Sequence, residues 1–557
     1  MKVVSHDGKT RPLQVGKTIF DYADELAVEV PTSCQRTGEC HECVVEIKAG
    51  MEALVDPTDA ELFLRDNYRL ACQASIALDD VDIEFAPLRR RPRILEPELR
   101  KTDTGDMSPM VTCQDDEILY GDLVIDRFRN KYFGLAVDLG TTTVVLELVD
   151  LATGISVAVA SFENPQRFGG SDIMNRISYD TENGAHGELQ KAVVTAINEG
   201  IRDMCRQVGI RPPHIYEIVL AGNSTMRDIL FGLDVQSIGQ KPYKSQTEYE
   251  FLEGLRETTA LTVDTRTVGL RANRNAKLHG LPLIASHVGA DAAACLAAID
   301  LTTGGETAML VDMGTNTEVV LHHEGEFYAA SCPAGPAFEG GLVTYGMSAY
   351  DGAIESIQLA ADGTAAEYST IGDVPALGLC GSGLIDLLAE VRRYEIMTPM
   401  GVFTDDRKRF DMTVVPDRGI TFSKEDASNL AQAKAANYSG QLIVMRTAGI
   451  NPADIQHLYL AGGFATYINV RNAIEIGLIA PVPEERVTKV GNASIDGARA
   501  LLLSKEKRTR LEDLVKTVTH IELETTPDFF EIFVEGCQLY PMPAVLPQAT
   551  AVESVAQ

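Results

Sequence analysis

VDLGTTTVV, residues 137–145, decides the fold of this 557-residue chain because the same pattern returns as VDMGTNTEV, residues 311–319. In both copies an apolar strand ends in an Asp, and a turn rich in Gly and Thr leads into a second strand. A longer pair follows in the same order, since GIRPPHIYEIVLAGN, residues 209–223, aligns without gaps to GINPADIQHLYLAGG, residues 449–463. Two repeats in the same order indicate a duplicated α/β domain.

The two Gly- and Thr-rich turns are suited to holding a triphosphate. Glycine lets backbone N–H groups approach phosphate oxygens, and threonine hydroxyls donate further hydrogen bonds. An Asp at the end of the strand can hold Mg²⁺ through water and offset the phosphate charge. The sequence therefore predicts an ATP clamp of two facing turns, with Asp138 and Asp312 as candidate Mg²⁺ residues. The candidate ATP-binding residues of the turns are Gly140, Thr141, Thr142, Thr143, Gly314, Thr315 and Asn316.

These segments resemble the actin, sugar-kinase and heat-shock-chaperone ATPase superfamily, called ASKHA. FGLAVDLGTTTV is similar to its first phosphate loop, AMLVDMGTNTEVVL to its second, and LYLAGGFA, residues 458–465, to its adenosine loop. The resemblance implies a duplicated α/β fold of the RNase H-like, actin-like kind. It also implies that Gly462, Gly463 and Phe464 contact ATP. Three loops in the expected order make unrelated glycine-rich hairpins the poorer explanation.

SHVGADAAACLAA, residues 286–298, resembles the segment in which sugar kinases and phosphatases of this superfamily carry a catalytic carboxylate. On that resemblance Asp291 orients the water that attacks the γ-phosphate. A structural role is the alternative, because an Asp can cap the helix predicted for AAACLAAI. The two roles are compatible. No sugar pocket is recognisable, which favours water over an alcohol as the acceptor.

Composition and charge restrict the class of protein. Hydrophobic residues make up 45% of the chain and charged residues 23%, as in an ordinary soluble globular protein. The formal net charge of −31 argues against nucleic-acid binding. Residues 1–15 lack the apolar core of a signal peptide, and no later stretch is apolar enough to span a bilayer, so we expect a cytoplasmic protein. RRRPR, residues 89–93, is interpreted as a solvated linker rather than a docking patch.

A second motif, CQRTGECHEC, occupies residues 34–43. Its cysteines are compatible with a disulfide knot, a zinc knuckle or an iron-sulfur site, and a reducing cytoplasm argues against disulfides. The spacing C-x5-C-x2-C, followed by a fourth Cys, is close to the plant-type 2Fe-2S pattern lengthened by one residue. A Rieske site needs two histidines, so His41 is not expected to be a ligand. The candidate 2Fe-2S ligands are Cys34, Cys40, Cys43 and Cys72, and zinc is the less favoured alternative.

The residues around this motif fit a β-grasp ferredoxin fold. MKVVSHDGKTRPLQV predicts two strands around the Asp7–Gly8 turn, TIFDYADELAV an amphipathic helix, and CVVEIKAG and VDIEFA two further strands. This α+β layout resembles 2Fe-2S ferredoxins. Cys332 and Cys380 are isolated among small residues, so a second cluster is less favoured.

The whole chain resembles the reductive activators of corrinoid enzymes, on the cysteine motif, the ASKHA loops and the segments CPAGPAFEGG and CGSGLID. The resemblance implies that ATP hydrolysis drives one electron from the 2Fe-2S cluster to the Co(II) form of a corrinoid protein of a methyltransferase system and restores Co(I). Because the first loop follows the linker directly, we expect no additional middle domain. The expected domains are a ferredoxin-like domain at 1–86, a linker at 87–132, ASKHA subdomains at 133–302 and 303–545, and a tail at 546–557.

Two other functions stay open from the sequence. One is an ATP-driven activator of another low-potential enzyme, such as a radical dehydratase, and the other is a non-enzymatic redox sensor that binds nucleotide. The expected partners are a corrinoid protein as electron acceptor and a low-potential electron donor, with neither nucleic acid nor membrane. The pathway, such as O-demethylation, and the oligomeric state cannot be read from the sequence, and a homodimer is one expectation.

Overall fold

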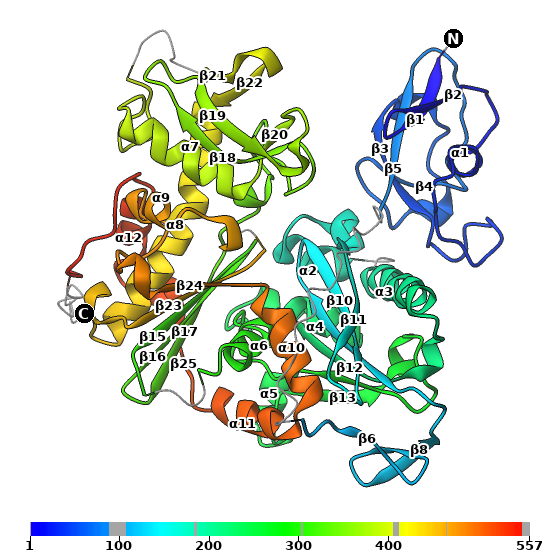
Figure 1. Cartoon of the computed structure of the whole chain (residues 1–557). Helices are drawn as coiled ribbons and strands as arrows, with labels where there is room; N and C mark the ends of the chain where they lie inside the picture. Colours follow the sequence, from blue (N-terminus) through cyan, green and yellow to red (C-terminus); the bar gives the residue numbers. More distant parts are fainter. Residues whose placement is uncertain are drawn as a thin grey trace, which may run out of the picture. The chain divides into compact units, whose positions relative to one another are not determined.

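The structure, a computed structural model, describes residues 2–88, 107–182, 186–301, 305–404, 411–463 and 465–547 (Figure 1). The chain divides into two compact units. The first unit is formed by the described parts of residues 1–290 and 498–508, and the second by those of 291–497 and 509–557. The first unit contains the N-terminal domain, residues 2–88, and the first α/β half. The second unit contains the second α/β half.

The N-terminal domain is a five-stranded sheet in the order β2-β1-β5-β3-β4. β1 pairs antiparallel with β2 and parallel with β5, which gives the mixed sheet of a β-grasp fold. Thr18 is the N-cap of α1, and its side chain forms a capping box with Asp21. The strands and the helix predicted for this domain are confirmed, and β4 is an addition. The elements are β1 (Val3–His6), β2 (Lys9–Pro12), α1 (Ile19–Leu26), β3 (Val44–Ala49), β4 (Tyr68–Leu70) and β5 (Ile83–Pro87).

Residues 111–127 form a small antiparallel sheet of β6 (Val111–Gln114), β7 (Glu117–Tyr120) and β8 (Leu123–Arg127). Asp126 ties this sheet to the first α/β half, because its carboxylate accepts hydrogen bonds from Tyr216 and Asn273. The expected linker at 87–132 is therefore corrected for these residues, whose strands of four or five residues are too short to be recognised by pattern. Residues 89–106, which include RRRPR, lie outside the described part of the chain.

The first α/β half contains a six-stranded sheet in the order β11-β10-β9-β12-β14-β13. β9 pairs antiparallel with β10 and parallel with β12. α3 packs against β10 and β11, and Gly209 ends it in a left-handed conformation. The strands are β9 (Phe133–Leu139), β10 (Thr143–Asp150), β11 (Ser156–Glu163), β12 (Ile215–Gly222), β13 (Leu261–Asp264) and β14 (Lys277–Gly280), and the helices are η4 (Pro165–Gly169), α2 (Ile173–Asp180), α3 (Glu188–Val208), α4 (Ser224–Phe231) and α5 (Gln246–Leu252).

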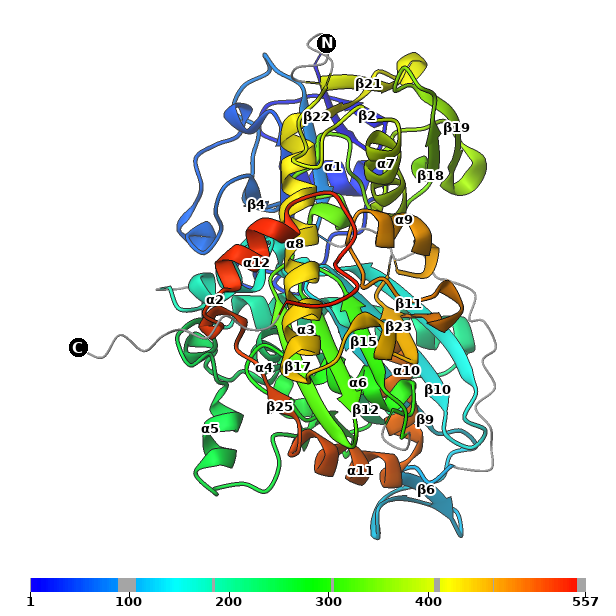
Figure 2. The same cartoon turned by 90° about the vertical axis from the view of Figure 1, so that its left-hand side faces the viewer.

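The second α/β half repeats this plan with a sheet in the order β24-β23-β15-β16-β17-β25. β15 pairs antiparallel with β16 and parallel with β23, as β9 does with β10 and β12. The long helix α8 packs on β16 and β17 (Figure 2). The duplicated α/β fold predicted from the repeats is thus confirmed. The elements are α6 (Ala290–Ala298), β15 (Ala308–Met313), β16 (Thr317–His323), β17 (Glu326–Cys332), α8 (Lys424–Thr447), β23 (His457–Ala461), α9 (Val470–Glu475), β24 (Val487–Gly491), β25 (Thr519–His520) and α12 (Phe529–Gly536).

An insertion between β17 and α8 enlarges the second half. It contains a three-stranded sheet in the order β19-β18-β20, against which α7 packs, and the hairpin of β21 and β22. Among the described residues of the first half, η4 and α2 are the elements between the corresponding strand and helix. The elements of the insertion are β18 (Ala353–Leu359), β19 (Ala365–Thr370), β20 (Gly378–Leu379), α7 (Gly381–Arg393), β21 (Asp411–Val415) and β22 (Ile420–Ser423).

The chain returns to the first unit at residues 498–508, which span the end of α10 (Ala493–Leu503) and the start of α11 (Lys505–Val515). Arg508 fixes residues 498–508 to the first unit. Its guanidinium donates to both carboxylate oxygens of the buried Glu217 at 2.7 and 2.9 Å. The pair joins residues 291 positions apart. The expected range of 303–545 for the second subdomain therefore differs from the observed division.

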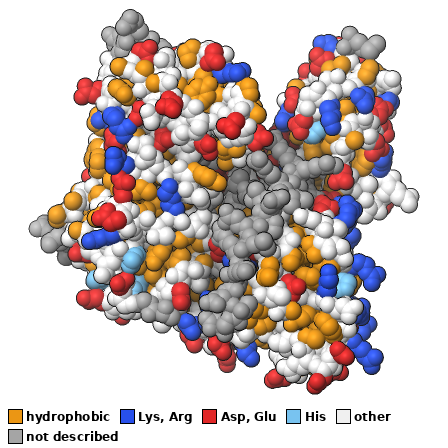
Figure 3. All heavy atoms as spheres, viewed as in Figure 1, with side chains coloured by type: hydrophobic (Ala, Val, Ile, Leu, Met, Phe, Trp, Pro, Cys, Tyr) orange, Lys and Arg blue, Asp and Glu red, His pale blue; other side chains and the backbone are white. Residues whose placement is uncertain are grey.

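The surface carries charges of both signs despite the net charge of −31. On the face shown in Figure 3, acidic and basic side chains are interspersed. No helix in the described ranges is both long and apolar enough to cross a membrane.

Candidate functional site

The four candidate cysteines come together in the N-terminal domain. Cys34, Cys40 and Cys43 lie in the loop between α1 and β3, and Cys72 follows β4. Cys34 is partly exposed, whereas the other three are buried. All ten cysteines of the chain are free, so none of these four forms a disulfide.

The four thiols form two pairs. The Sγ atoms of Cys43 and Cys72 are 3.4 Å apart. Cys34 and Cys40 form the other pair, because their side chains are hydrogen-bonded to each other. The Oγ1 atom of Thr32 lies 4.0 Å from each of their Sγ atoms. In the described ranges, no group of three or more His, Cys, Asp and Glu side chains is arranged to hold a single metal ion. Two pairs suit the two irons of a 2Fe-2S cluster.

Hydrogen bonds favour the thiolate form at two of these cysteines. The bond with Thr37 lowers the pKa of the Cys34 thiol to about 5. The bond between Cys43 and Cys72 lowers the pKa of Cys72 to about 7 and raises that of Cys43. Because iron binds the thiolate, one member of each pair is prepared for ligation.

The cluster loop needs glycine at one position. Gly38 has a φ of 88°, and a Cβ there would lie 3.0 Å from Nε2 of Gln73. The same amide group of Gln73 donates to Sγ of Cys72 at 3.4 Å. A side chain at Gly38 would therefore push the loop away from the cysteines.

His41 contacts the first α/β half. Its Nδ1 atom lies 2.8 Å from Oε1 of Glu188, the first residue of α3. Its ring stacks on Phe63, with the ring centroids 4.3 Å apart. These contacts support the interpretation that His41 is not a ligand. They also join the cluster loop directly to the first α/β half.

The first phosphate loop contains Gly140, Thr141 and Thr142, between β9 and β10. Asn164 donates from Nδ2 to the carbonyl oxygen of Gly140 at 2.9 Å. Asn223, the N-cap of α4, donates to Oγ1 of Thr141 at 2.9 Å. Asp138 lies near the end of β9 and Thr143 begins β10, so the predicted residues of this loop are adjacent. Two amide side chains, neither of them predicted, hold the loop in place.

The second phosphate loop contains Gly314, Thr315 and Asn316, between β15 and β16. Thr315 donates from Oγ1 to Glu339 at 2.5 Å. Nδ2 of Asn316 is buried, and it has no hydrogen-bond partner in the described part of the chain. An unpaired buried donor costs about 1–3 kcal/mol. The loop therefore offers a donor to an incoming acceptor such as a phosphate oxygen.

Three carboxyl groups besides Glu339 gather beside the second loop. Asp312 is the cross-strand partner of Glu318 in the β15–β16 hairpin, and Asp291 lies in the first turn of α6. Glu318 is 4% exposed. Burial raises the pKa of the Glu318 carboxyl well above its usual range, and the charges of Asp291 and Asp312 raise it further. Asp291 is the second residue of α6, so it lies within the helix rather than at the N-cap. Its carboxylate accepts a hydrogen bond from the N–H of Ala292 at 2.8 Å.

A glycine at the end of the repeated strand allows the same close backbone approach in both halves. A Cβ at Gly222 would lie 2.8 Å from the carbonyl oxygen of Leu139. At the equivalent Gly462, which has a φ of 108°, a Cβ would overlap the carbonyl oxygen of Met313. In each half the glycine brings the end of one strand against the phosphate loop of its neighbour. Gly463 follows in the same loop, and Phe464 lies outside the described residues.

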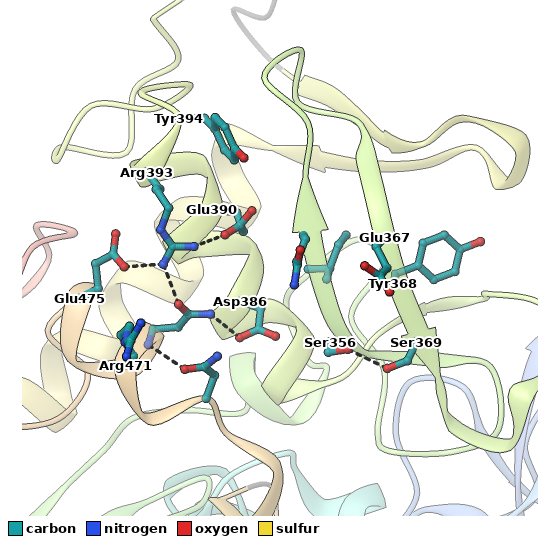
Figure 4. A pocket seen from close by; sticks show the side chains of 14 residues that line it. Ser356, Glu367, Tyr368, Ser369, Asp386, Glu390, Arg393, Tyr394, Arg471 and Glu475 are labelled. Carbon is teal, nitrogen blue, oxygen red and sulfur yellow. Dashed lines mark hydrogen bonds and ion pairs between the residues drawn. The ribbon is translucent and has the colours of Figure 1, made fainter. Parts of the chain in front are cut away.

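A pocket of about 610 Å³ opens between α7, α9 and the β18–β19 hairpin (Figure 4). Asn472 of α9 lines the pocket, donating to Asp386 at 2.7 Å and accepting from Arg393 at 2.8 Å. Tyr368 and Tyr394 add aromatic rings to the lining. α9 follows the Gly462–Gly463 loop along the chain, so this polar and aromatic pocket belongs to the same half as the second phosphate loop.

The two isolated cysteines are packed in the second half. A Cβ at Gly440 of α8 would overlap Sγ of Cys332, and Cys380 donates to the carbonyl oxygen of Ile354 at 3.3 Å. This packing supports the interpretation that they hold no second cluster. The sequence missed the functional candidates Asn164, Asn223 and Glu318. Only Asn223 carried a signal, because it takes the place of Gly463 in the longer repeat.

Three family models match the chain. The model for a 2Fe-2S iron-sulfur cluster binding domain matches residues 4–77, so the N-terminal domain is of that kind. The model described as the RACo middle region matches residues 133–304. The model described as the C-terminal domain of RACo, the ASKHA domain, matches residues 306–549. The expectation that no middle domain is present is wrong, because the segment that we assigned to the first ASKHA subdomain matches the middle region.

Two curated relatives and one solved structure are similar over most of their lengths. The corrinoid activation enzyme RamQ of Eubacterium limosum is 30% identical over 446 residues, which cover 75% of this chain and 73% of the relative. The [Co(II) methylated amine-specific corrinoid protein] reductase of Methanosarcina barkeri is 22% identical over 432 residues, covering 73% and 76%. A solved structure described as a reductive activator for corrinoid,iron-sulfur protein has 25% identity, a TM-score of 0.69, and covers 97% of this chain and 98% of its own.

The identity and coverage of the first relative, the three matched models and the shared fold lead to one assignment. The chain belongs to the family of reductive activators of corrinoid proteins.

Proposed function

We propose that this protein uses ATP to restore the Co(I) state of a corrinoid protein of a methyltransferase system. In the overall reaction Co(II) gains one electron from an external low-potential donor, and ATP is hydrolysed to ADP and phosphate. When bound, the 2Fe-2S cluster supplies a one-electron carrier between that donor and the cobalt. Family membership supports the corrinoid substrate, and the two α/β halves with their phosphate loops support the use of ATP.

Four cysteines would hold the cluster in the N-terminal domain. The pairs Cys34 with Cys40 and Cys43 with Cys72 match the two ligands that each iron requires. The thiol pairs, their free state and the match to a 2Fe-2S domain all support this assignment.

The two phosphate loops would hold the triphosphate. Asp138 and Asp312 stand at the strand ends, where a carboxylate can bind Mg²⁺ through water. The unpaired Nδ2 of Asn316 is ready to donate to a phosphate oxygen. Asp291, beside Asp312 and Glu318, would orient the attacking water.

The pocket between α7 and α9 would receive the nucleoside of ATP. Carboxylates accept hydrogen bonds from ribose hydroxyls, and tyrosine rings such as that of Tyr394 can lie against a base. Asp386 and Glu390 are among the residues that line the pocket. The position of α9, which follows the Gly462–Gly463 loop, supports this assignment.

ATP is useful when the acceptor has a more negative reduction potential than the cluster, because the electron transfer is then unfavourable alone. Plant-type clusters have reduction potentials near roughly −400 mV. For one electron, about 59 mV corresponds to about 1.4 kcal/mol. A conformational change driven by ATP can supply a few kcal/mol. That free energy corresponds to a difference of roughly one or two hundred millivolts between the reduction potentials of the cluster and its acceptor.

One observation carries the proposal, namely the 2.8 Å hydrogen bond between His41 and Glu188. His41 stands between the cluster ligands Cys40 and Cys43, and Glu188 begins the helix that packs on the sheet of the first phosphate loop. The electron-carrying loop and the nucleotide-binding half are therefore in direct contact within one unit. Contact of this kind is what coupling between ATP and electron transfer requires.

Replacing one predicted ligand tests the cluster assignment. We expect Cys40→Ser to abolish the visible charge-transfer bands of the 2Fe-2S centre and to leave ATP binding intact. Cys332→Ser is the matched control, because this buried cysteine lies in the second half and should leave the bands unchanged. Full iron content and colour in Cys40→Ser would contradict the assignment.

Phosphate release tests the link to the corrinoid substrate. We expect ATP hydrolysis to rise when an oxidised, Co(II)-containing corrinoid protein is added. Hydrolysis that does not respond to the corrinoid protein would contradict the proposal. Absence of hydrolysis under any condition would favour a nucleotide-binding redox sensor.

A further inference from the structure

Residues 164–180, here called the coupling segment, lie between the first phosphate loop and the N-terminal domain. The segment contains η4 and α2. It follows β11 directly and belongs to the first unit, as do both regions that it contacts. Neither the cluster nor the nucleotide residues predicted from the sequence fall within it.

One set of side chains in the coupling segment binds the first phosphate loop. Asn164 donates to the carbonyl oxygen of Gly140, and its backbone N–H donates to the carbonyl oxygen of Thr142 at 2.7 Å. Nδ2 of Asn164 also donates to Oε1 of Gln166 at 3.1 Å. The buried Arg176 extends this network, because its Nη1 atom lies 3.5 Å from the same oxygen of Gln166.

Another set binds the N-terminal domain. Arg167 donates to the carbonyl oxygens of Leu88 at 3.0 Å and Pro87 at 3.3 Å. The same guanidinium lies 3.6 Å from the carboxylate of Glu46 in β3. Arg167 thus holds the end of β5 and the neighbouring strand at once.

Two aromatic residues complete the second set. Phe168 meets Phe63 edge to face, with centroids 6.2 Å apart, and it meets Tyr68 at 6.4 Å. The hydroxyl of Tyr179 donates to the carbonyl oxygen of Phe63 at 2.5 Å. The ring of His41 in the cluster loop also stacks on Phe63. Phe63 therefore contacts both the coupling segment and the cluster loop.

The interior of the coupling segment leaves little room for independent movement. Gln166, Phe168 and Gly169 are buried. A Cβ at Gly169 would lie 2.7 Å from Leu189 of α3. A tightly packed element between two sites moves as a unit, because its packing cannot deform continuously.

We infer that the coupling segment transmits the state of the first phosphate loop to the N-terminal domain, with Arg167 and Tyr179 as its positioning residues. This inference deepens the proposed function and rests on it, since nucleotide at the first loop is the signal. Gln166 and Arg167 are adjacent, so a shift of the backbone at Gln166 also moves the residue that holds β5. Nucleotide binding would thereby change how firmly the cluster loop is held against α3.

Hydrogen exchange of the full chain, with the cluster assembled, tests the inference. The probe is Mg-ATP, and the readout is the exchange rate of backbone amides in residues 61–70. We expect Mg-ATP to change these rates by at least about fivefold, the lower end of usual coupling between sites. Phosphate release is measured on the same samples. No corrinoid protein is present, so the result does not depend on reduction of cobalt.

Variants of the coupling segment separate transmission from nucleotide binding. We expect Arg167→Ala to reduce the change in exchange to less than about twofold, while phosphate release stays within about twofold of wild type. Tyr179→Phe removes one hydrogen bond and should give an intermediate response with little risk to folding. Arg206→Ala is the control, because this arginine is 73% exposed on α3 and should leave both readouts unchanged.

Three results decide between the possibilities. A wild-type protein that hydrolyses ATP without any change in exchange would overturn the inference and leave the proposed function standing. Full transmission in both Arg167→Ala and Tyr179→Phe would also overturn it. A wild-type protein that releases no phosphate from ATP would count against the proposed function. If Mg-ATP still changed the exchange rates in that protein, the result would support transmission by the coupling segment.

Discussion

The first phosphate loop is backed by amide side chains. Asn164 and Asn223 donate to Gly140 and Thr141, and no charge is brought to the loop by these two contacts. The position opposite Asp138 in the β9–β10 hairpin is the apolar Val145.

The second phosphate loop is backed by carboxylates although its backbone follows the same plan. Thr315 donates to Glu339, and the position opposite Asp312 in the β15–β16 hairpin is Glu318. Asp291 adds a further acidic group to this neighbourhood.

This difference indicates that the two duplicated loops have different roles. Amides fix a loop without repelling a phosphate, and through the coupling segment the first loop is joined to the N-terminal domain. Ionised carboxylates repel a triphosphate until a cation neutralises them, and the raised pKa of Glu318 reflects the acidic groups of Asp291 and Asp312 beside it. The second loop is therefore suited to Mg²⁺ and water chemistry. We therefore expect the first loop to transmit the nucleotide state to the N-terminal domain and the second loop to catalyse ATP hydrolysis.

Alanine at the repeated glycines gives the largest effect. Gly462→Ala places a Cβ in overlap with Met313 at a φ of 108°, which should destabilise the second half by about 3 kcal/mol or more and abolish ATP binding. Gly222→Ala makes only a 2.8 Å contact without a positive φ, so a loss of about 1–2 kcal/mol is expected. Thermal unfolding and ATP titration measure both. Equal losses would show that the two strand ends are not differently constrained.

Removing the aspartates one at a time sharpens the comparison of the loops. We expect Asp312→Ala to lower Mg-ATP turnover about a hundredfold and Asp138→Ala about tenfold, because the acid-rich loop depends more on the cation. Steady-state phosphate release measures both variants. The spectrum of the reduced cluster serves as the control and should not change. Unchanged turnover in Asp312→Ala would remove this residue from the metal site.

The pH dependence of stability gives the smallest effect. The pKa of buried Glu318 is raised, so the folded state keeps a proton that the unfolded state releases. The free energy of unfolding should therefore fall as pH rises above the usual range of a carboxyl group, by at most about 1.4 kcal/mol per pH unit. Glu318→Gln should remove this part of the slope. Denaturant unfolding at several pH values measures it, and identical slopes would show that Glu318 is not held protonated.

Much of the fold could be predicted because it follows local patterns. The two repeats marked the strands on both sides of each phosphate loop, and the spacing of four cysteines marked the N-terminal site. The β-grasp strands followed from alternating residues around the Asp7–Gly8 turn.

The remaining features depend on contacts between distant residues. The return of residues 498–508 depends on the pairing of Arg508 with Glu217, which no local pattern contains. Glu318 is a charged residue, a type that is usually exposed, yet it is buried and Ser331 of β17 donates a hydrogen bond to it. The start of the coupling segment recurs weakly in the second half, because Pro165, Gly169 and Gly170 match Pro336, Gly340 and Gly341. Its contacts with the N-terminal domain join distant residues, which no repeat reveals.

One measurement tests the central claim most directly. A corrinoid protein in its Co(II) state is mixed anaerobically with the reduced full chain, and the absorption spectrum of Co(I) is followed with and without Mg-ATP. We expect Co(I) to form with Mg-ATP, and to fail to form without nucleotide or with the Cys40→Ser variant. Equal formation of Co(I) in the absence of ATP, or with that variant, would contradict the account.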